Sequence, residues 1–138
     1  MQFPEEYIKR GRFELHSGEI SDVFYDVNSL ITDKKYFSEI INNIPLANHY
    51  VGIATGGAII AMAASIKNSA LFSMIKDAEL KGKMPEDNWI LIDDVATTEA
   101  SLRETLKLTN SQPKEIFVAV DRRKTQDKKL KLKAMFEV

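Results

Sequence analysis

The chain has 138 residues, 44% of them hydrophobic, which suffices for one compact domain and is too short for two ordinary ones. A formal net charge of -1, with 28% charged residues, excludes a global basic field that would attract nucleic acid or an anionic membrane. The absence of cysteine excludes disulfides, thiolate metal sites and cysteine nucleophiles, and it favours a reducing compartment.

The first third of the chain predicts a strand and a helix. Residues 22–27, DVFYDV, are rich in residue types that favour strands. Asp33 is a suitable N-cap for a helix through KKYFSEIINNI, and Pro45 ends that helix. A hydrophobic face on this helix would bury it against the rest of the domain.

Apolar strands and helices alternate through the remaining two thirds. HYVGIA predicts a buried strand, and AIIAMAASIKN a helix that is apolar on nearly all sides and is therefore expected to be buried. Residues 77–88, DAELKGKMPEDN, are polar and predict an exposed loop. Further strands are expected at ALFSMI, WILI, KEIFVAV and KAMFEV, with a helix after WILI. This order predicts an α/β fold in which helices cover both faces of a parallel sheet.

The turn formed by Thr55, Gly56 and Gly57 is a candidate anion site. In an open parallel sheet, ligands lie beyond the carboxyl ends of the strands, where helix N-termini present free backbone N–H groups. Two glycines let the backbone approach an anion closely, and the threonine adds a hydroxyl. The same glycines would serve any tight turn between a strand and a helix, so both interpretations stay open.

A second turn follows the strand WILI. Asp93 and Asp94 end this apolar strand, and Thr97, Thr98 and Ser101 supply hydroxyl groups just after it. Paired acids can hold ribose hydroxyls or a cation, while hydroxyl and backbone N–H groups hold a phosphate, so the turn suits a phosphorylated sugar. The competing interpretation is that Asp94 only ends the strand and Ser101 caps the next helix.

WILIDDVATTEAS resembles the phosphoribosyl pyrophosphate (PRPP) motif of type I phosphoribosyltransferases. Three further segments are similar to the orotate phosphoribosyltransferase branch: GRFELHSGEISDVFYDV, VGIATGG and VAVDRRK, in the order of the family. His16 lies where the family often has a basic residue. The resemblance implies one type I phosphoribosyltransferase-like domain over residues 1–138, with a small N-terminal hood at 1–45 that binds the base and a PRPP-binding core at 46–138.

The resemblance also implies roles for single residues. Asp93, Asp94 and Lys76 would be catalytic, with the two aspartates on the ribose hydroxyls. Arg122 would face an acidic base such as orotate. The base pocket would consist of Phe24, Tyr25, Thr97 and Arg122. The residues in contact with PRPP would be Thr55, Gly56, Gly57, Lys76, Asp93, Asp94, Thr97, Thr98, Glu99, Ala100 and Ser101. From the residues alone, one ring of the pair Phe24 and Tyr25 would be core by strand alternation, and Arg122 could be part of a solvated face.

The implied reaction is displacement of pyrophosphate from C1 of PRPP by a ring nitrogen of a pyrimidine, orotate in this branch. Mg²⁺ would be held through PRPP, with Asp93 and Asp94 as its nearest protein groups, and the enzyme would be a homodimer. The oxocarbenium-like transition state calls for positioning and charge stabilisation rather than a protein nucleophile. A phosphoribosyltransferase for another base is a third possibility, which FELHSG disfavours.

Three positions depart from the family pattern. Glu99 replaces the glycine of the phosphate turn, and a carboxylate about 5 Å from a phosphate would cost on the order of 3 kcal/mol per unit of phosphate charge. Alternatively, Glu99 points outward and favours the helix dipole, or its carboxylate sits in the place of the phosphate. Ile75 replaces the arginine of an Arg-Lys pair, and residues 77–88 are shorter than the family's mobile loop. These departures leave a second hypothesis, a non-catalytic or regulatory homologue that binds a nucleotide or phosphosugar weakly.

Other partners are not expected. The basic run RRKTQDKKLKLK contains an acid and two leucines and no aromatic residue, which disfavours a nucleic-acid site. No segment has the roughly 20 apolar residues of a membrane span, and MQFPEEYIKR lacks the apolar run of a secretion signal. We therefore expect a cytoplasmic protein with small-molecule substrates.

Overall fold

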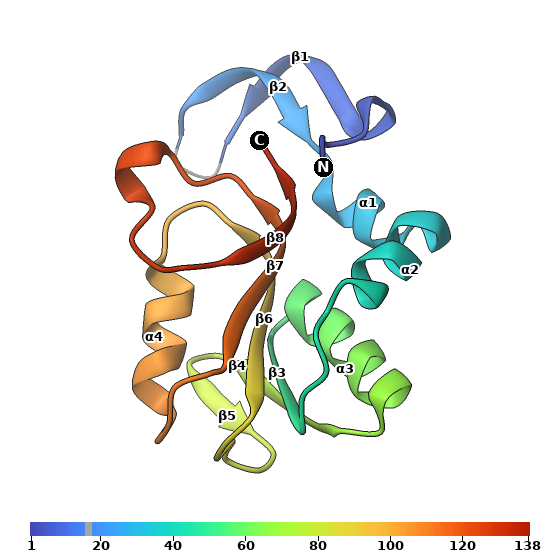
Figure 1. Cartoon of the computed structure of the whole chain (residues 1–138). Coiled ribbons are helices and arrows are strands. Elements are labelled where there is room, and N and C mark those ends of the chain that lie inside the picture. The colour runs from blue at the N-terminus through green and yellow to red at the C-terminus, as the bar shows by residue number, and fades with distance from the viewer. Residues whose placement is uncertain (16–17) are drawn as a thin grey trace.

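A six-stranded sheet in the order β5-β4-β3-β6-β7-β8 forms the centre of the protein (Figure 1). The computed structural model describes residues 1–15 and 18–138, and His16 lies outside these ranges. The strands are β3 (His49–Ile53), β4 (Leu71–Lys76), β5 (Glu79–Lys81), β6 (Trp89–Ala96), β7 (Glu115–Asp121) and β8 (Lys133–Glu137). β5 pairs with β4 in the antiparallel sense, and the other neighbouring pairs are parallel. The predicted parallel α/β sheet is confirmed.

Helices cover both faces of this sheet, as the strand and helix order predicts. The helices α1 (Val27–Thr32), α2 (Lys34–Asn42) and α3 (Gly56–Asn68) contribute to the apolar cluster on one face, and α4 (Ala100–Leu108) packs on the other (Figure 1). β6 serves both clusters, because successive side chains of a strand point to opposite faces. Ile90 and Ile92 belong to the first cluster, whereas Trp89 and Leu91 belong to the second.

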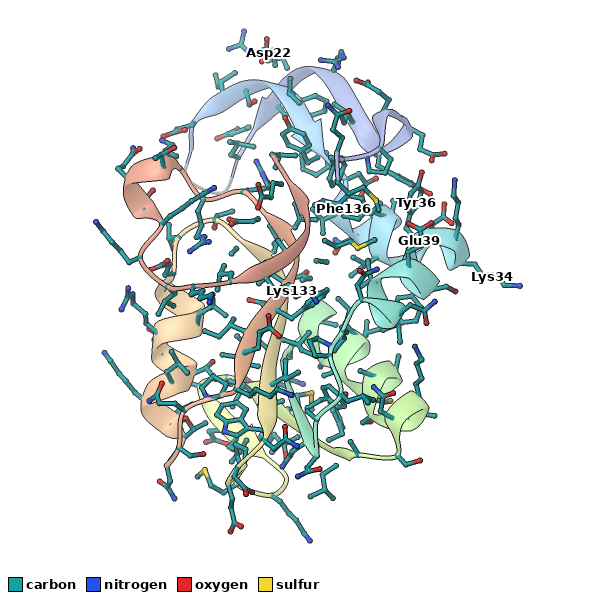
Figure 2. All side chains as sticks on the ribbon, in the orientation of Figure 1. Asp22, Lys34, Tyr36, Glu39, Lys133 and Phe136 are labelled. Carbon is teal, nitrogen blue, oxygen red and sulfur yellow. The ribbon has the colours of Figure 1, made fainter. Side chains whose placement is uncertain are left out.

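The N-terminal segment forms a hairpin of its own. After a short 3-10 helix, η1 (Glu5–Tyr7), β1 (Ile8–Glu14) and β2 (Ile20–Tyr25) pair as an antiparallel two-stranded sheet that lies beyond the carboxyl ends of the central strands (Figure 1). Aromatic contacts join this region to the main sheet, because the ring of Phe3 packs against Tyr25 of β2 at 5.2 Å and against Phe136 of β8 at 6.0 Å between centroids. Phe136 of β8 packs against Tyr36 of α2, with ring centroids 6.2 Å apart (Figure 2).

The strand expected at residues 22–27 ends earlier than the sequence suggests. β2 stops at Tyr25, and Val27 begins α1, a helix that the sequence reading missed. The cause is Asp26, whose carboxylate accepts hydrogen bonds from the backbone N–H of Ser29 at 3.2 Å and from its hydroxyl at 2.7 Å. A side-chain acceptor at this place caps the new helix. Six residues are too few to show a helical period.

The predicted N-cap at Asp33 is confirmed. Its carboxylate accepts a hydrogen bond from the backbone N–H of Lys35 at 2.9 Å, and the Tyr7 hydroxyl donates to the same carboxylate. We expect Asp33→Ala to lower the melting temperature by roughly 2–6 °C, because both donors lose their acceptor. Asp33→Asn keeps an acceptor oxygen and should lose less. Equal melting temperatures for the wild type and the alanine variant in a calorimetric scan would contradict this role.

The expectation that α3 is buried on all sides is wrong, because one face of the helix is exposed. Ile59, Met62 and Ile66 are 43%, 48% and 75% exposed, whereas Ile60, Ala61 and Ala64 on its other face are fully buried. The exposed residues follow the spacing i, i+3, i+7, so they form one stripe along the helix. A uniformly apolar helix does not reveal which face its own domain covers.

Residues 77–88 also differ from the expected loop, because they contain a two-residue turn followed by the strand β5. Asp77 and Ala78 have positive φ angles of 53° and 58°, and the register of β4 with β5 joins Lys76 to Glu79 across them. Positive φ at both central residues marks a two-residue hairpin turn of the primed type. The turn carries no glycine, so the sequence did not indicate it.

Within the described residues, no helix is long and apolar enough to cross a membrane.

Candidate functional site

The two candidate turns lie together at the carboxyl edge of the sheet. β3 and β6 are parallel neighbours, and Gly52 stands opposite Ile92, so the segments that follow both strands leave the sheet at the same edge. A Cβ atom on Gly57 would lie 2.6 Å from the carbonyl oxygen of Ile92, and one on Gly56 would overlap the Asp94 carboxylate. Side chains cannot be accommodated at either position. The absence of side chains on the two glycines therefore leaves room for the acidic end of β6, in addition to room for the approach of an anion.

The Asp93 carboxyl is largely buried, and Asp94 is half-buried. Asp93 Oδ1 accepts a hydrogen bond from the backbone N–H of Asp94 at 2.8 Å, and Asp94 Oδ1 accepts one from the backbone N–H of Val95, also at 2.8 Å. Burial, reinforced by the neighbouring Asp94 carboxyl, raises the pKa of Asp93 to about 8. The strand end therefore holds Asp93 protonated near neutral pH, where an ordinary aspartate is charged.

This raised pKa gives Asp93 a specific pH signature. The carboxyl titrates near 3.8 in an unfolded chain and near 8 in the folded protein, so between these values the folded state binds the extra proton. Its contribution to stability therefore falls as the pH rises through that window, by at most about 1.4 kcal/mol per pH unit. Asp93→Asn should be more stable than the wild type near pH 7 and similar to it near pH 4. Urea titrations across this range measure the slope, and an unchanged slope in the variant would contradict the assignment.

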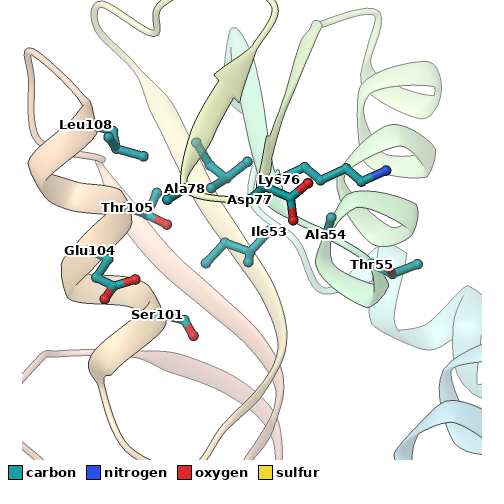
Figure 3. A pocket seen from close by; sticks show the side chains of 11 residues that line it. Ile53, Ala54, Thr55, Lys76, Asp77, Ala78, Ser101, Glu104, Thr105 and Leu108 are labelled. Carbon is teal, nitrogen blue, oxygen red and sulfur yellow. The ribbon is translucent and has the colours of Figure 1, made fainter.

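A cavity of about 270 Å³ lies between α4 and the ends of β3 and β4 (Figure 3). It brings together three residues predicted to contact PRPP: Thr55, Lys76 and Ser101. Asp77 and Glu104 also line it, so its walls carry two acids beside one lysine. The full lining is Ile53, Ala54, Thr55, Ile75, Lys76, Asp77, Ala78, Ser101, Glu104, Thr105 and Leu108. Asp93 and Asp94 are not part of the lining, although Asp94 contacts Gly56, the neighbour of Thr55.

Ile75 takes a structural position. Its side chain is buried in the apolar cluster under α4, together with Val51 and Leu91. Lys76, one residue later, is exposed at the end of β4. Among the described residues that line the cavity, strand alternation thus leaves Lys76 as the one cation, where the family pattern has two.

Glu99 occupies none of the three positions considered for it. The residue is only 6% exposed, and its carboxylate accepts hydrogen bonds from Arg103 Nη2 at 2.7 Å and Arg123 Nη1 at 2.6 Å. The backbone N–H groups of Lys129 and Leu130 donate to it at 2.9 and 2.7 Å. Burial alone raises the pKa of Glu99, but these hydrogen bonds outweigh it and lower the pKa to about 2. The carboxylate is thus charged, buried and directed to the connection between β7 and β8.

This placement corrects the expected electrostatic penalty on a phosphate. Arg103 and Arg123 balance the charge of Glu99 at contact distance, so its field at the neighbouring turn is largely cancelled. The φ angle of Glu99 is -108°, a value open to any residue, so the turn does not require glycine there. The predicted PRPP contact of Glu99 therefore does not hold for its carboxylate.

The two aromatic residues predicted to line a base pocket separate. Tyr25 packs against the main core, and the Arg122 guanidinium lies 5.1 Å from the centroid of its ring. Phe24 is 37% exposed and stacks on Phe13 in the hairpin. The backbone N–H of Arg122 donates to the Ala96 carbonyl at 2.8 Å, which places this arginine at the end of β6. The structure thus joins Tyr25 and Arg122 and directs Phe24 elsewhere.

The sequence reading missed Arg123. This buried arginine donates to Asp121 through Nε at 2.9 Å and through Nη2 at 2.8 Å, besides its contact with Glu99. An aspartate at the end of an apolar strand, with an arginine two residues later on the same side, is the signal that was available.

The sequence and the fold are similar to those of known proteins. No protein-family model matches the chain. The orotate phosphoribosyltransferase of Sulfurisphaera tokodaii is 31% identical over 138 residues, covering 87% of this chain and 70% of that protein. The enzyme of the same name from Methanosarcina acetivorans is 27% identical, covering 90% and 76%.

Solved phosphoribosyltransferase structures have the same overall fold. The orotate phosphoribosyltransferase from Aeropyrum pernix superposes with a TM-score of 0.66 at 25% identity, covering 84% of this chain and 76% of that one. The adenine phosphoribosyltransferase from Rhodothermus marinus has a TM-score of 0.66 at 11% identity and covers 97% and 96%, a likeness of fold alone.

Proposed function

This chain belongs to the orotate phosphoribosyltransferase family, and on that premise we propose that it transfers the ribose 5-phosphate of PRPP to orotate. A ring nitrogen of the base forms the new bond to C1 while the bond from C1 to the pyrophosphate oxygen breaks. The observation that carries the proposal is the packing of Asp94 against Gly56. It sets the acidic strand end and the glycine turn side by side at the edge where parallel sheets bind ligands.

Each part of PRPP has a counterpart at this edge. The Asp94 carboxylate and the carboxyl oxygens of Asp93 would accept hydrogen bonds from the ribose hydroxyls, and residues 97–101 would hold the 5′-phosphate at the N-terminus of α4. The turn at residues 55–57, together with Lys76, would hold the pyrophosphate. Charge that develops at C1 in the transition state would be stabilised by the nearby Asp94 carboxylate, so catalysis would rest on positioning and electrostatics.

The base would bind on the hood side of this edge. The Arg122 guanidinium lies over the Tyr25 ring, and the backbone of Arg122 is bonded to the end of β6, the strand that carries the proposed ribose-binding residues. A planar guanidinium suits the carboxylate of an acidic base, with which it forms paired hydrogen bonds. This supports orotate over a neutral base.

The acidic strand end suits Mg²⁺ shared with the substrate. Carboxylate oxygens are hard ligands, and Mg²⁺ is usually held by one or two carboxylates together with phosphate oxygens. Within the described residues, no group of three or more His, Cys, Asp or Glu side chains could hold a metal ion. Asp93, a buried acid with a raised pKa, gains a charge partner if a cation binds beside it. The ion would supply neutralisation of the pyrophosphate charge.

A second copy of the chain is the partner that we propose for α3. Its exposed stripe of Ile59, Met62 and Ile66 is an apolar surface of the kind that marks protein contacts. We expect the wild type to be a dimer and Ile66→Glu to be predominantly monomeric by sedimentation velocity, because the charge would be buried in the contact. Exposed Lys67→Glu, beside the stripe, is the control and should stay dimeric. If Ile66→Glu remains dimeric, the exposed stripe of α3 is not the contact between the two copies.

An assay of orotate consumption with Mg-PRPP tests the proposed reaction. The expected result is PRPP-dependent loss of orotate with equimolar release of pyrophosphate, and no reaction with uracil or adenine. One observation favours the second candidate, a homologue that binds without turnover: the cavity beside the glycine turn carries two acids and one lysine. Saturable binding of Mg-PRPP without orotate consumption would select that candidate and refute the proposed reaction.

A further inference from the structure

Glu99 stands at the start of α4 but does not cap it. Its side chain makes no capping hydrogen bond at this N-cap position. One partner of the carboxylate, Arg103, lies one helical turn further along α4, and the other partners lie outside both the turn and the helix. Oε2 alone receives Arg123 Nη1 and the backbone N–H groups of Lys129 and Leu130. A single side chain therefore ties the turn at residues 97–101 to the connection between β7 and β8, residues 122–132.

Arg123 completes the tie from the other side. Its guanidinium holds Asp121 with two donors, and Nη1 reaches both Glu99 and the Leu130 carbonyl, the latter at 2.8 Å. Both Glu99 and Arg123 have side chains that are 5% exposed, so the pair is largely shielded from water and salt. Counting Arg103, two carboxylates face two guanidinium groups. The cluster is neutral in sum, and Glu99, Arg123 and Asp121 are buried, in contrast to a surface ion pair.

The buried pair of Glu99 and Arg123 adjoins both parts of the proposed nucleotide site, the phosphate turn and the base contact. Glu99 follows Thr98 in the phosphate turn, and Arg123 follows Arg122, the proposed base contact. We propose that Glu99 is a positioning residue that fixes the phosphate turn relative to Arg122 and so sets the span between the phosphate and base subsites. The inference rests on the proposed function and adds to it a residue that does not touch the substrate.

The variant Glu99→Gly distinguishes two possible roles of this carboxylate, positioning of the turn and repulsion of the phosphate, because they change the KM for PRPP in opposite directions. If Glu99 positions the turn, its removal should raise the KM for PRPP and the KM for orotate by about tenfold or more, with a smaller change in kcat, because misplaced groups weaken binding at both ends. If the carboxylate repels the phosphate, the KM for PRPP should fall. A merely structural residue would lower the amount of active enzyme and leave both KM values unchanged.

A readout without ligand separates this inference from the proposed function. Amide hydrogen exchange in Glu99→Gly should accelerate in residues 97–101 and 128–131, while β6 and β7 keep their protection. Lys107→Gln, which changes an exposed residue in the last turn of α4 outside the Glu99 cluster, is the control and should leave exchange and KM values near the wild type. If the wild type does not consume orotate, the proposed function fails, and hydrogen exchange still decides the role of Glu99.

The outcomes that overturn the inference are specific. Unchanged exchange in residues 97–101, or a lower KM for PRPP, would refute it. Glu99→Gln keeps the size of the side chain and guards against a glycine variant that does not fold. Loss of protection throughout β6 and β7 in both variants would show a purely structural residue and would also refute positioning.

Discussion

Asp94→Asn is expected to reduce kcat/KM for orotate phosphoribosylation by about 100- to 1,000-fold while the fold is retained. Asparagine keeps an acceptor oxygen for the backbone N–H of Val95, which lies 2.8 Å from Asp94 Oδ1. It also keeps the size of a side chain that packs against Gly56. What it removes is the negative charge at the proposed ribose and cation position, where charge develops in the transition state.

Steady-state assays with a matched control check this expectation. Asp87→Asn removes an exposed aspartate from the loop between β5 and β6, at the opposite end of β6 from Asp93 and Asp94, and should leave kcat/KM unchanged. Circular dichroism and melting temperature establish that both variants are folded. A rate for Asp94→Asn within about twofold of the wild type would remove the acidic strand end from the mechanism.

Arg123→Leu is expected to lower the free energy of unfolding by about 3–5 kcal/mol. The substitution leaves the buried carboxylates of Glu99 and Asp121 without their shared cation, and it removes the donors to both. An uncompensated buried charge is among the most destabilising changes in proteins, whereas an exposed ion pair contributes little.

Urea denaturation of Arg123→Leu beside Arg122→Leu measures this difference. Arg122 has its contact with the face of Tyr25 and is partly exposed, so its loss should cost about 1 kcal/mol or less. The cost of Arg123→Leu should shrink as the pH falls and the two carboxyls protonate, because their pKa values are held low in the folded wild type. Equal losses for the two arginines would contradict the assigned cluster.

Local patterns account for what the sequence predicted correctly. The run WILI is buried on both faces of the sheet, because a continuous apolar run implies a covered parallel strand. The strand does not end at the two acids as predicted: β6 continues through Asp93 and Asp94 to Ala96 and stays paired with β7. The cap at Asp33 needs only the residues next to it. The glycine turn at residues 55–57 was visible for the same reason, although the structure adds that the acidic strand end fills the space the glycines leave.

Contacts between distant residues account for most of what it did not predict. Glu99 is held by groups 24 to 31 positions further along the chain, and no spacing rule connects them. Arg123 rather than Arg122 is the buried arginine because alternation places it on the side of Asp121, a distinction that the resemblance to VAVDRRK hid. β5 depends on two positive φ angles at residues without the usual glycine.

We propose that the acidic residues of β6 and the glycine turn before α3 form one PRPP site, and isothermal titration of Mg-PRPP tests this most directly. We expect saturable binding of one PRPP per chain to the wild type, and affinity at least about tenfold weaker for both Asp94→Asn and Gly56→Ala, since a Cβ at Gly56 would displace the Asp94 carboxylate. Absence of binding to the folded wild type, or equal affinity in all three proteins, would contradict it.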